Sequence, residues 1–128
     1  MYPPIRCCQD LKVWKAGVIL ASLCYQLTRR FPNDERYGLT SQIRRAAASI
    51  PANIAEGHGR LHRGDYLRFL SAAIGSLREL ETEVLLAKQL GYVTRGDGNQ
   101  IFQLADEVGR MLGSLTRKLR TNAPAPNP

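Results

Sequence analysis

Two histidines and three glutamates come nearest, by type and spacing, to forming a chemical site in this sequence. His58 and His62 are four positions apart, which lets two imidazoles bind one metal ion when both lie on the same helix. Gly57 and Gly59 disfavour a helix here, and no third ligand is evident. We therefore predict no metal site, and we expect two solvent-facing histidines among arginines.

Glu79, Glu81 and Glu83 form the densest acidic group. On a helix, Glu79 and Glu83 share one face and Glu81 points away from it. A di-iron bundle would need Glu-x-x-His pairs on two helices, and the sequence has none. We expect the glutamates to form ion pairs on the surface or between subunits, with Glu79 or Glu83 bound to an arginine.

The segment Gly57-His58-Gly59-Arg60 is similar to a phosphate-binding loop only in its glycines. A dinucleotide-binding loop must follow a strand, and a P-loop needs Gly-Lys followed by Ser or Thr, so neither motif is present. Glu56 has no nucleophile or basic partner spaced to complete a catalytic site. The sequence thus predicts no enzyme, no cofactor and no small-molecule substrate.

Four segments with apolar residues at helical spacing supply the framework, at about residues 10–31, 37–57, 62 (or 65) to 90, and 95–119. No segment alternates as a half-buried strand does. We predict an all-α, antiparallel up-down-up-down four-helix bundle over residues 10–120, between an N-terminal extension (1–9) and a disordered, proline-rich tail (121–128). Asp10 is the expected first N-cap, Gly91 the C-cap of the third helix, and Thr94 with Asp97 a capping box.

Pro51 falls inside the second segment, where it removes a backbone donor and clashes with the preceding turn, at about 3 kcal/mol in a regular helix. We therefore expect a kinked second helix, with the kink or a break near Ser49–Pro51. Ser49 or Asn53 is expected to bond the freed backbone groups. Glu56 is expected to pair with an arginine of the second or third helix. Pro51, Asn53 and Glu56 are interpreted together as a structural motif.

The first segment has more apolar surface than one bundle core requires. It carries two neighbouring stripes: Leu11, Trp14, Val18, Ala21 and Tyr25, and then Val13, Leu20, Leu23 and Leu27. We expect the surplus face to form a subunit interface. The aromatic residues Trp14, Tyr25, Tyr66 and Phe69 follow core-like spacing, so we predict no platform on which bases stack and no sequence-specific recognition.

The chain is basic, with a net charge of +7 and fourteen arginines among its eighteen basic residues. Arginine binds phosphate oxygens in pairs, which favours polyanionic partners, although a GC-rich genome also encodes arginine freely. Two local groups stand out: Arg60, Arg63 and Arg68 beside the histidines, and Arg117, Lys118 and Arg120 late in the fourth segment. Antiparallel neighbours bring both groups to one end of the bundle, so we predict a nucleic-acid-binding surface there. The second group also complements the dipole of its own helix, which is the alternative explanation.

The cellular setting follows from two absences in the sequence. The longest apolar stretch, residues 16–23, is too short to span a bilayer, and no secretory cleavage pattern is present, so we expect a cytoplasmic protein without a membrane partner. Cys7, Cys8 and Cys24 are odd in number and form no Cys-x-x-Cys pair. We expect reduced thiols, with Cys24 behaving as a small hydrophobic residue.

Several motifs occur in a fixed order along the chain and resemble those of one bacterial family. They are Phe31-Pro32, Glu35-Arg36-Tyr37-Gly38-Leu39-Thr40-Ser41-Gln42, Arg45-Ala46, Ser49-Ile50-Pro51-Ala52-Asn53-Ile54-Ala55-Glu56-Gly57, Arg68-Phe69-Leu70, Gly75-Ser76-Leu77, Glu79-Leu80-Glu81-Thr82 and Ala87-Lys88-Gln89-Leu90-Gly91-Tyr92. Over roughly residues 10–119 the chain resembles the four-helix bundle family encoded in intervening sequences of bacterial large-subunit ribosomal RNA. It is distantly similar to the accessory proteins of diversity-generating retroelements. Gly64, Gly96 and Gly98 depart from the family pattern near the starts of the third and fourth helices.

The resemblance implies a homopentameric ring of bundles, often with a basic surface, whose suspected role is nucleic-acid binding without enzymatic activity. The expected function is therefore a non-catalytic homo-oligomer that binds RNA or DNA through the phosphate backbone. The alternative is a protein-interaction scaffold, or an accessory subunit, that docks a partner protein without touching nucleic acid.

Overall fold

The computed structural model describes residues 8–121, with side chains from Lys12 onward. Its helices are α1 (Cys8–Thr28), α2 (Leu39–His58), α3 (Arg63–Gln89) and α4 (Arg95–Thr121), with a short 3-10 helix, η1 (Asn33–Glu35), between α1 and α2. Residues 8–121 contain no strand, which confirms the predicted all-α class. The expected extension and tail lie outside the described residues, apart from Cys8, Gln9 and Thr121, which are helical.

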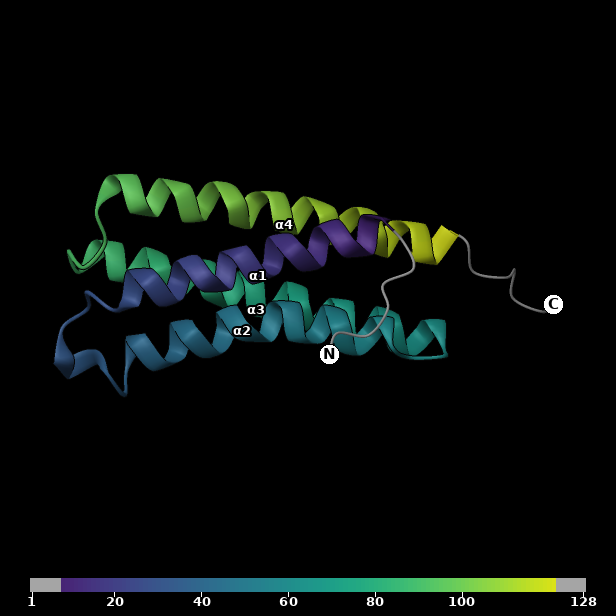
Figure 1. Cartoon of the computed structure of the whole chain (residues 1–128), viewed down its shortest axis with the longest axis horizontal. Helices are drawn as coiled ribbons and strands as arrows, with labels where there is room; N and C mark the ends of the chain where they lie inside the picture. Colours follow the sequence, from purple (N-terminus) through teal and green to yellow (C-terminus); the bar gives the residue numbers. More distant parts are fainter. Residues whose placement is uncertain (1–7, 122–128) are drawn as a thin grey trace.

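The four helices run side by side as an antiparallel bundle (Figure 1). α1 packs on α2, α2 on α3, α3 on α4, and α4 on α1, whereas the diagonal pairs make no close backbone approach within the described residues. This is the predicted up-down-up-down arrangement. The α2–α3 turn and the end of α4 therefore lie at one end of the bundle, and the α1–α2 and α3–α4 connections lie at the other (Figure 1).

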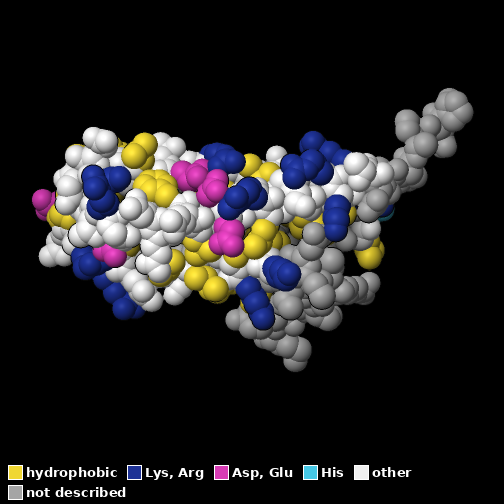
Figure 2. Space-filling model, turned by 90° about the horizontal axis from the view of Figure 1, so that it is seen from above, with side chains coloured by type: hydrophobic (Ala, Val, Ile, Leu, Met, Phe, Trp, Pro, Cys, Tyr) yellow, Lys and Arg dark blue, Asp and Glu magenta, His cyan; other side chains and the backbone are white. Residues whose placement is uncertain are grey.

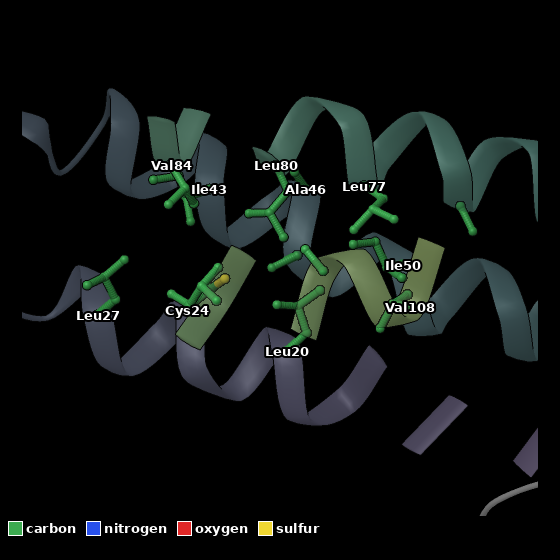
Figure 3. Close-up of a cluster of buried hydrophobic side chains, with 14 of the residues drawn as sticks. Leu20, Cys24, Leu27, Ile43, Ala46, Ile50, Leu77, Leu80, Val84 and Val108 are labelled. Atoms are coloured by element: carbon green, nitrogen blue, oxygen red, sulfur yellow. The ribbon is translucent and has the colours of Figure 1, made fainter. Parts of the chain in front are cut away.

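Aliphatic side chains from all four helices meet in a single core (Figure 3). The apolar seam of α3, spaced at alternating three- and four-residue steps, begins at Tyr66, which is partly buried. Its other members are fully buried: Leu70, Ala73, Leu77, Leu80, Val84 and Ala87. Cys24 packs among these side chains, and burial raises the pKa of its thiol to about 12, as expected for a residue used as a hydrophobe. No helix in residues 8–121 combines the length and apolar character needed to cross a membrane.

One of the two predicted stripes of α1 faces the core, and the other is divided, with Trp14 and Ala21 partly buried against the core and Val18 and Tyr25 exposed. Val13, Leu20 and Leu27 are buried, whereas Val18 is 40% and Tyr25 is 41% exposed. The core-like placement predicted for Tyr25 is wrong. Spacing alone does not show which of two adjacent stripes the neighbouring helices cover.

α2 continues through Pro51 without a break. Of the two expected outcomes, a kink or a break near Ser49–Pro51, the break is therefore wrong. Pro51 is buried against α1 at Gly17, where an added Cβ would lie 3.5 Å from the Pro51 Cβ. Asn53 Nδ2 donates to the carbonyl of Ser49, and the Ser49 hydroxyl donates to the carbonyl of Ala46, both at 2.8 Å. Neither bond reaches the carbonyl of Ala47, which loses its donor to Pro51, so the prediction that Ser49 or Asn53 bonds the freed group is wrong for these side-chain bonds. Packing of α1 and α3 along α2 offsets the local cost of Pro51.

α3 ends at Gln89 with Leu90 as its C-cap, and Gly91 follows with the predicted left-handed conformation. This glycine has φ 84°, and its amide donates to the carbonyl of Lys88 at 3.0 Å. The amide of Tyr92 donates to the carbonyl of Ala87 at 3.0 Å. The two bonds satisfy carbonyls of the last turn, and the left-handed conformation that they require is one that glycine adopts without steric cost.

The N-terminus of α4 carries the predicted Thr94–Asp97 pair. Thr94 Oγ1 accepts from the amide of Asp97 at 3.3 Å and donates to the Asp97 carboxylate at 3.0 Å. Arg30, which follows the end of α1, binds the same carboxylate at 2.5 Å, and this hydrogen bond lowers the pKa of Asp97. The cap prediction for α1 is wrong, because the helix already begins at Cys8 and Asp10 lies inside it.

Candidate nucleic-acid interface

The six cations predicted to contact phosphates come from three segments at one end of the bundle. Arg60 lies in the turn after α2, Arg63 and Arg68 at the start of α3, and Arg117, Lys118 and Arg120 in the last turns of α4. Figure 1 shows the α2–α3 turn and the C-terminal end of α4 at the same end. The antiparallel topology thus gives the shared location that the helix directions predicted.

Arg60 and Arg68 are held by local contacts. Arg60 pairs with Glu56 at 2.9 Å and Arg68 with Asp65 at 3.1 Å, all on largely exposed side chains. Both guanidinium groups lie beside the ring of Phe69, at 4.9 and 5.8 Å from its centroid. The partner of Glu56 therefore belongs to the turn after α2 and not, as predicted, to a helix. Because carboxylates offset its charge, this part of the surface is less basic than the sequence suggests.

The end of α4 carries less compensating charge. No acidic residue follows Glu107 in the sequence, whereas four exposed cations do: Arg110, Arg117, Lys118 and Arg120. Figure 2 looks onto the face formed by α4 and α1, where Asp and Glu side chains occur in the left and middle parts. Towards the C-terminal end of α4, on the right, Lys and Arg side chains continue without them (Figure 2). On this face, basic side chains without acidic neighbours therefore lie towards the C-terminal end of α4 (Figure 2).

A groove of about 360 Å³ opens between α3 and α4 beside these cations. Three arginines line it, Arg78 from α3 with Arg110 and Arg117 from α4, together with Asp106 and two glycines. The glycines keep it open, since an added Cβ at Gly109 would lie 3.3 Å from Cδ2 of Leu77. At Gly113 an added Cβ would lie 3.3 Å from Nη1 of Arg117.

Two of the three groove arginines form ion pairs with carboxylates. Arg78 pairs with Glu81 at 2.6 Å and Arg110 with Asp106 at 3.3 Å. Arg117 has no carboxylate partner among residues 8–121. Sequence reasoning missed Arg78, because its place in the groove depends on how closely α3 approaches the glycines of α4. No spacing within one helix contains that information.

Glu83 does not form the ion pair that was predicted for the glutamate group. Its side chain is buried, and Oε1 has no hydrogen-bond partner within the described residues. Burial, together with the charge of Glu79 and a hydrogen bond to it, raises the pKa of Glu83 to about 7. Of the three glutamates, Glu81 is the one that pairs with an arginine in the described chain. The prediction of an arginine partner for Glu79 or Glu83 is therefore wrong within residues 8–121, and pairing between subunits stays a prediction.

The two histidines do not share a helical turn, because α2 ends at His58 and α3 begins after His62. His58 is half-buried, with its ring edge-on to Tyr66 at 5.9 Å between centroids, whereas His62 is exposed. The solvent-facing prediction holds for His62 and is wrong for His58, which Tyr66 partly covers. Across the described residues, no group of three or more His, Cys, Asp or Glu side chains is placed to hold a metal ion.

Comparison with known proteins identifies both a family and a fold. The family model described as "23S rRNA-intervening sequence protein" matches residues 9–114. The crystal structure of a protein with unknown function from the S23 ribosomal protein family of Bacteroides thetaiotaomicron is similar, with a TM-score of 0.79 and 25% identity. That match covers 85% of this chain and 98% of the other. No curated protein matches the chain.

Proposed function

The chain belongs to the 23S rRNA-intervening sequence protein family, and we propose that it binds nucleic acid through the phosphate backbone without catalysing a reaction. The observation that carries this proposal is the end of α4, where four exposed cations follow the last acidic residue and border an arginine-lined groove. A surface of this kind attracts polyanions, and each phosphate that it neutralises releases counterions from the nucleic acid.

The groove arginines are suited to phosphate because their present partners are weakly held. Both guanidinium groups are exposed, and so is Asp106, whereas Glu81 is half-buried; ion pairs at the surface contribute roughly 0–1 kcal/mol. A phosphate presents several charged oxygens and accepts paired hydrogen bonds from a guanidinium group. Exchange of a surface carboxylate for a phosphate therefore costs little, and Arg117 has no carboxylate to give up within residues 8–121.

Self-association is part of the proposal. Leu85 and Leu86 of α3 are about half exposed, and so are Leu90, which follows α3, and Ile19 of α1. Apolar side chains gathered on outer helix faces are typical of surfaces that another molecule covers. A homo-oligomer, and a pentameric ring in particular, would cover them and repeat the basic end of α4 in every subunit. The same apolar side chains favour the second candidate function, a scaffold that docks a partner protein.

A charge reversal on one helix tests the binding surface. We expect Arg117→Glu to weaken binding of a fluorescently labelled RNA hairpin roughly tenfold and to lower the salt dependence by about one phosphate contact. Arg95→Glu is the matched control, because Arg95 is an exposed arginine of the same helix at the opposite end of the bundle. Fluorescence anisotropy on both variants, with circular dichroism to verify folding, provides the comparison. Equal affinities for the two variants would refute this location.

A further inference from the structure

A second groove, of about 420 Å³, lies around the α1–α2 connection. Three arginines (Arg36, Arg44, Arg45), two tyrosines (Tyr25, Tyr37) and two hydroxyl residues of the first turn of α2 line it. We propose that this groove binds an unpaired nucleotide of a nucleic-acid strand, with its phosphate among the arginines and its base on Tyr37. The class of ligand rests on the proposed function, whereas the site and the preference for unpaired strands are new.

The positive charge of this groove has no acidic counterpart in its lining. None of the three guanidinium groups pairs with a carboxylate within residues 8–121, in contrast to Arg78 and Arg110 of the first groove. The first turn of α2 already has an acidic cap, because the amide of Leu39 donates to Oε1 of Glu35 at 3.1 Å, so the arginines supply the unbalanced charge of the groove. An anionic ligand would therefore supply the missing counter-charge.

Arg44 is already fixed in position for such a ligand. Its Nε donates to Thr28 Oγ1 at 2.8 Å, and its guanidinium group lies 4.8 Å from the centroid of the Tyr25 ring. The side chain is half-buried and makes these contacts to neutral groups. Because its conformation is set before binding, little side-chain entropy is lost when it contacts a phosphate.

Tyr37 distinguishes this groove from a simple anion site. Its side chain is 87% exposed, and its described neighbour is Arg36, whose guanidinium carbon lies 5.5 Å from the ring centroid. An exposed ring beside arginines gives a base a surface to stack on, and the arginines add cation–π attraction. Bases inside a duplex are already stacked on one another. The arrangement therefore selects unpaired nucleotides.

The test compares a short unstructured RNA with the same sequence in a duplex, each fluorescently labelled and titrated with the full chain. We expect Tyr37→Ala to weaken single-strand binding fivefold or more and to leave duplex binding unchanged. Tyr37→Phe, which keeps the ring, should bind like the wild type. The exposed position of Tyr37 predicts unchanged thermal unfolding for both variants.

The outcomes separate this site from the proposed function. Wild-type single-strand affinity in Tyr37→Ala, with the Arg117→Glu effect on the hairpin intact, would overturn the nucleotide site and leave the proposed function standing. Tyr37-dependent binding of single strands, with no hairpin binding at all, would support the groove and overturn the α4 surface. Equal loss of single-strand and duplex binding in Tyr37→Ala would show that stacking on an unpaired base is not the mechanism.

Discussion

Replacing Glu83 by glutamine is expected to raise the free energy of unfolding at about pH 8 by up to about 3 kcal/mol, and to leave it nearly unchanged at about pH 4. The pKa of Glu83 rises from 4.5 to about 7, with burial as the largest cause. Between these values the folded chain holds a proton that the unfolded chain releases. The resulting stability is complete below 4.5 and is lost as the pH rises through about 7.

Urea unfolding followed by circular dichroism over this pH range measures the effect. The wild type should lose stability with rising pH, and Glu83→Gln should lose less. Glu81→Gln is the control, because Glu81 forms a surface pair with Arg78, and its loss should change stability by less than about 1 kcal/mol. A loss of stability in Glu83→Gln at about pH 8 would contradict the prediction and would indicate that a cation from another subunit satisfies this carboxylate.

Truncation of Leu80 to alanine is expected to cost about 2–5 kcal/mol of the free energy of unfolding. Leu80 is fully buried in the α3 seam, facing the side chains that α1 and α2 bring into the core (Figure 3). The loss combines the transfer of apolar surface with the cavity that remains after truncation. Urea midpoints and slopes give the change directly.

Leu61→Ala provides the matched control, since it removes the same atoms from a side chain that is 99% exposed. This variant should keep wild-type stability to within about 0.5 kcal/mol. A loss at Leu80 no larger than the loss at Leu61 would show that the seam is not the core of the folded protein.

The helices could be predicted because the information that forms them is local. The seam of α3 follows from steps of three and four residues between apolar side chains, and those positions are buried. Gly91 could be placed because the left-handed C-cap favours glycine over residues with a Cβ, and its φ is 84°. Short connections then favour antiparallel neighbours, which fixes the order of the bundle.

The failed predictions depend on contacts between helices. A break at Pro51 was plausible from the local cost of proline, but packing on both sides of α2 keeps the helix continuous. Tyr25 and Val18 follow the same spacing as core residues, and only the positions of α2 and α4 show that they face outward. Glu83 looks like a surface residue in a charged sequence until the bundle buries it.

The sequence predicted where the candidate surface lies, but it did not predict all of the residues that form it. Chain direction placed Arg60 and Arg117 at the same end of the bundle, and the structure agrees (Figure 1). The groove itself was not predictable, because Arg78 joins it through the close approach of α3 to Gly109 of α4. The second groove was missed for a related reason, since Tyr37 stands in a family motif whose spacing does not reveal that its ring is exposed.

The salt dependence of RNA binding tests the central claim most directly. Purified wild-type protein would be titrated into a labelled structured RNA at several salt concentrations, with folding verified by circular dichroism. A surface built on Arg78, Arg110, Arg117, Lys118 and Arg120 predicts that the logarithm of the affinity falls with the logarithm of salt with a slope of roughly −3 or steeper. Folded protein that shows no binding at low salt would contradict the claim and favour the protein-docking scaffold.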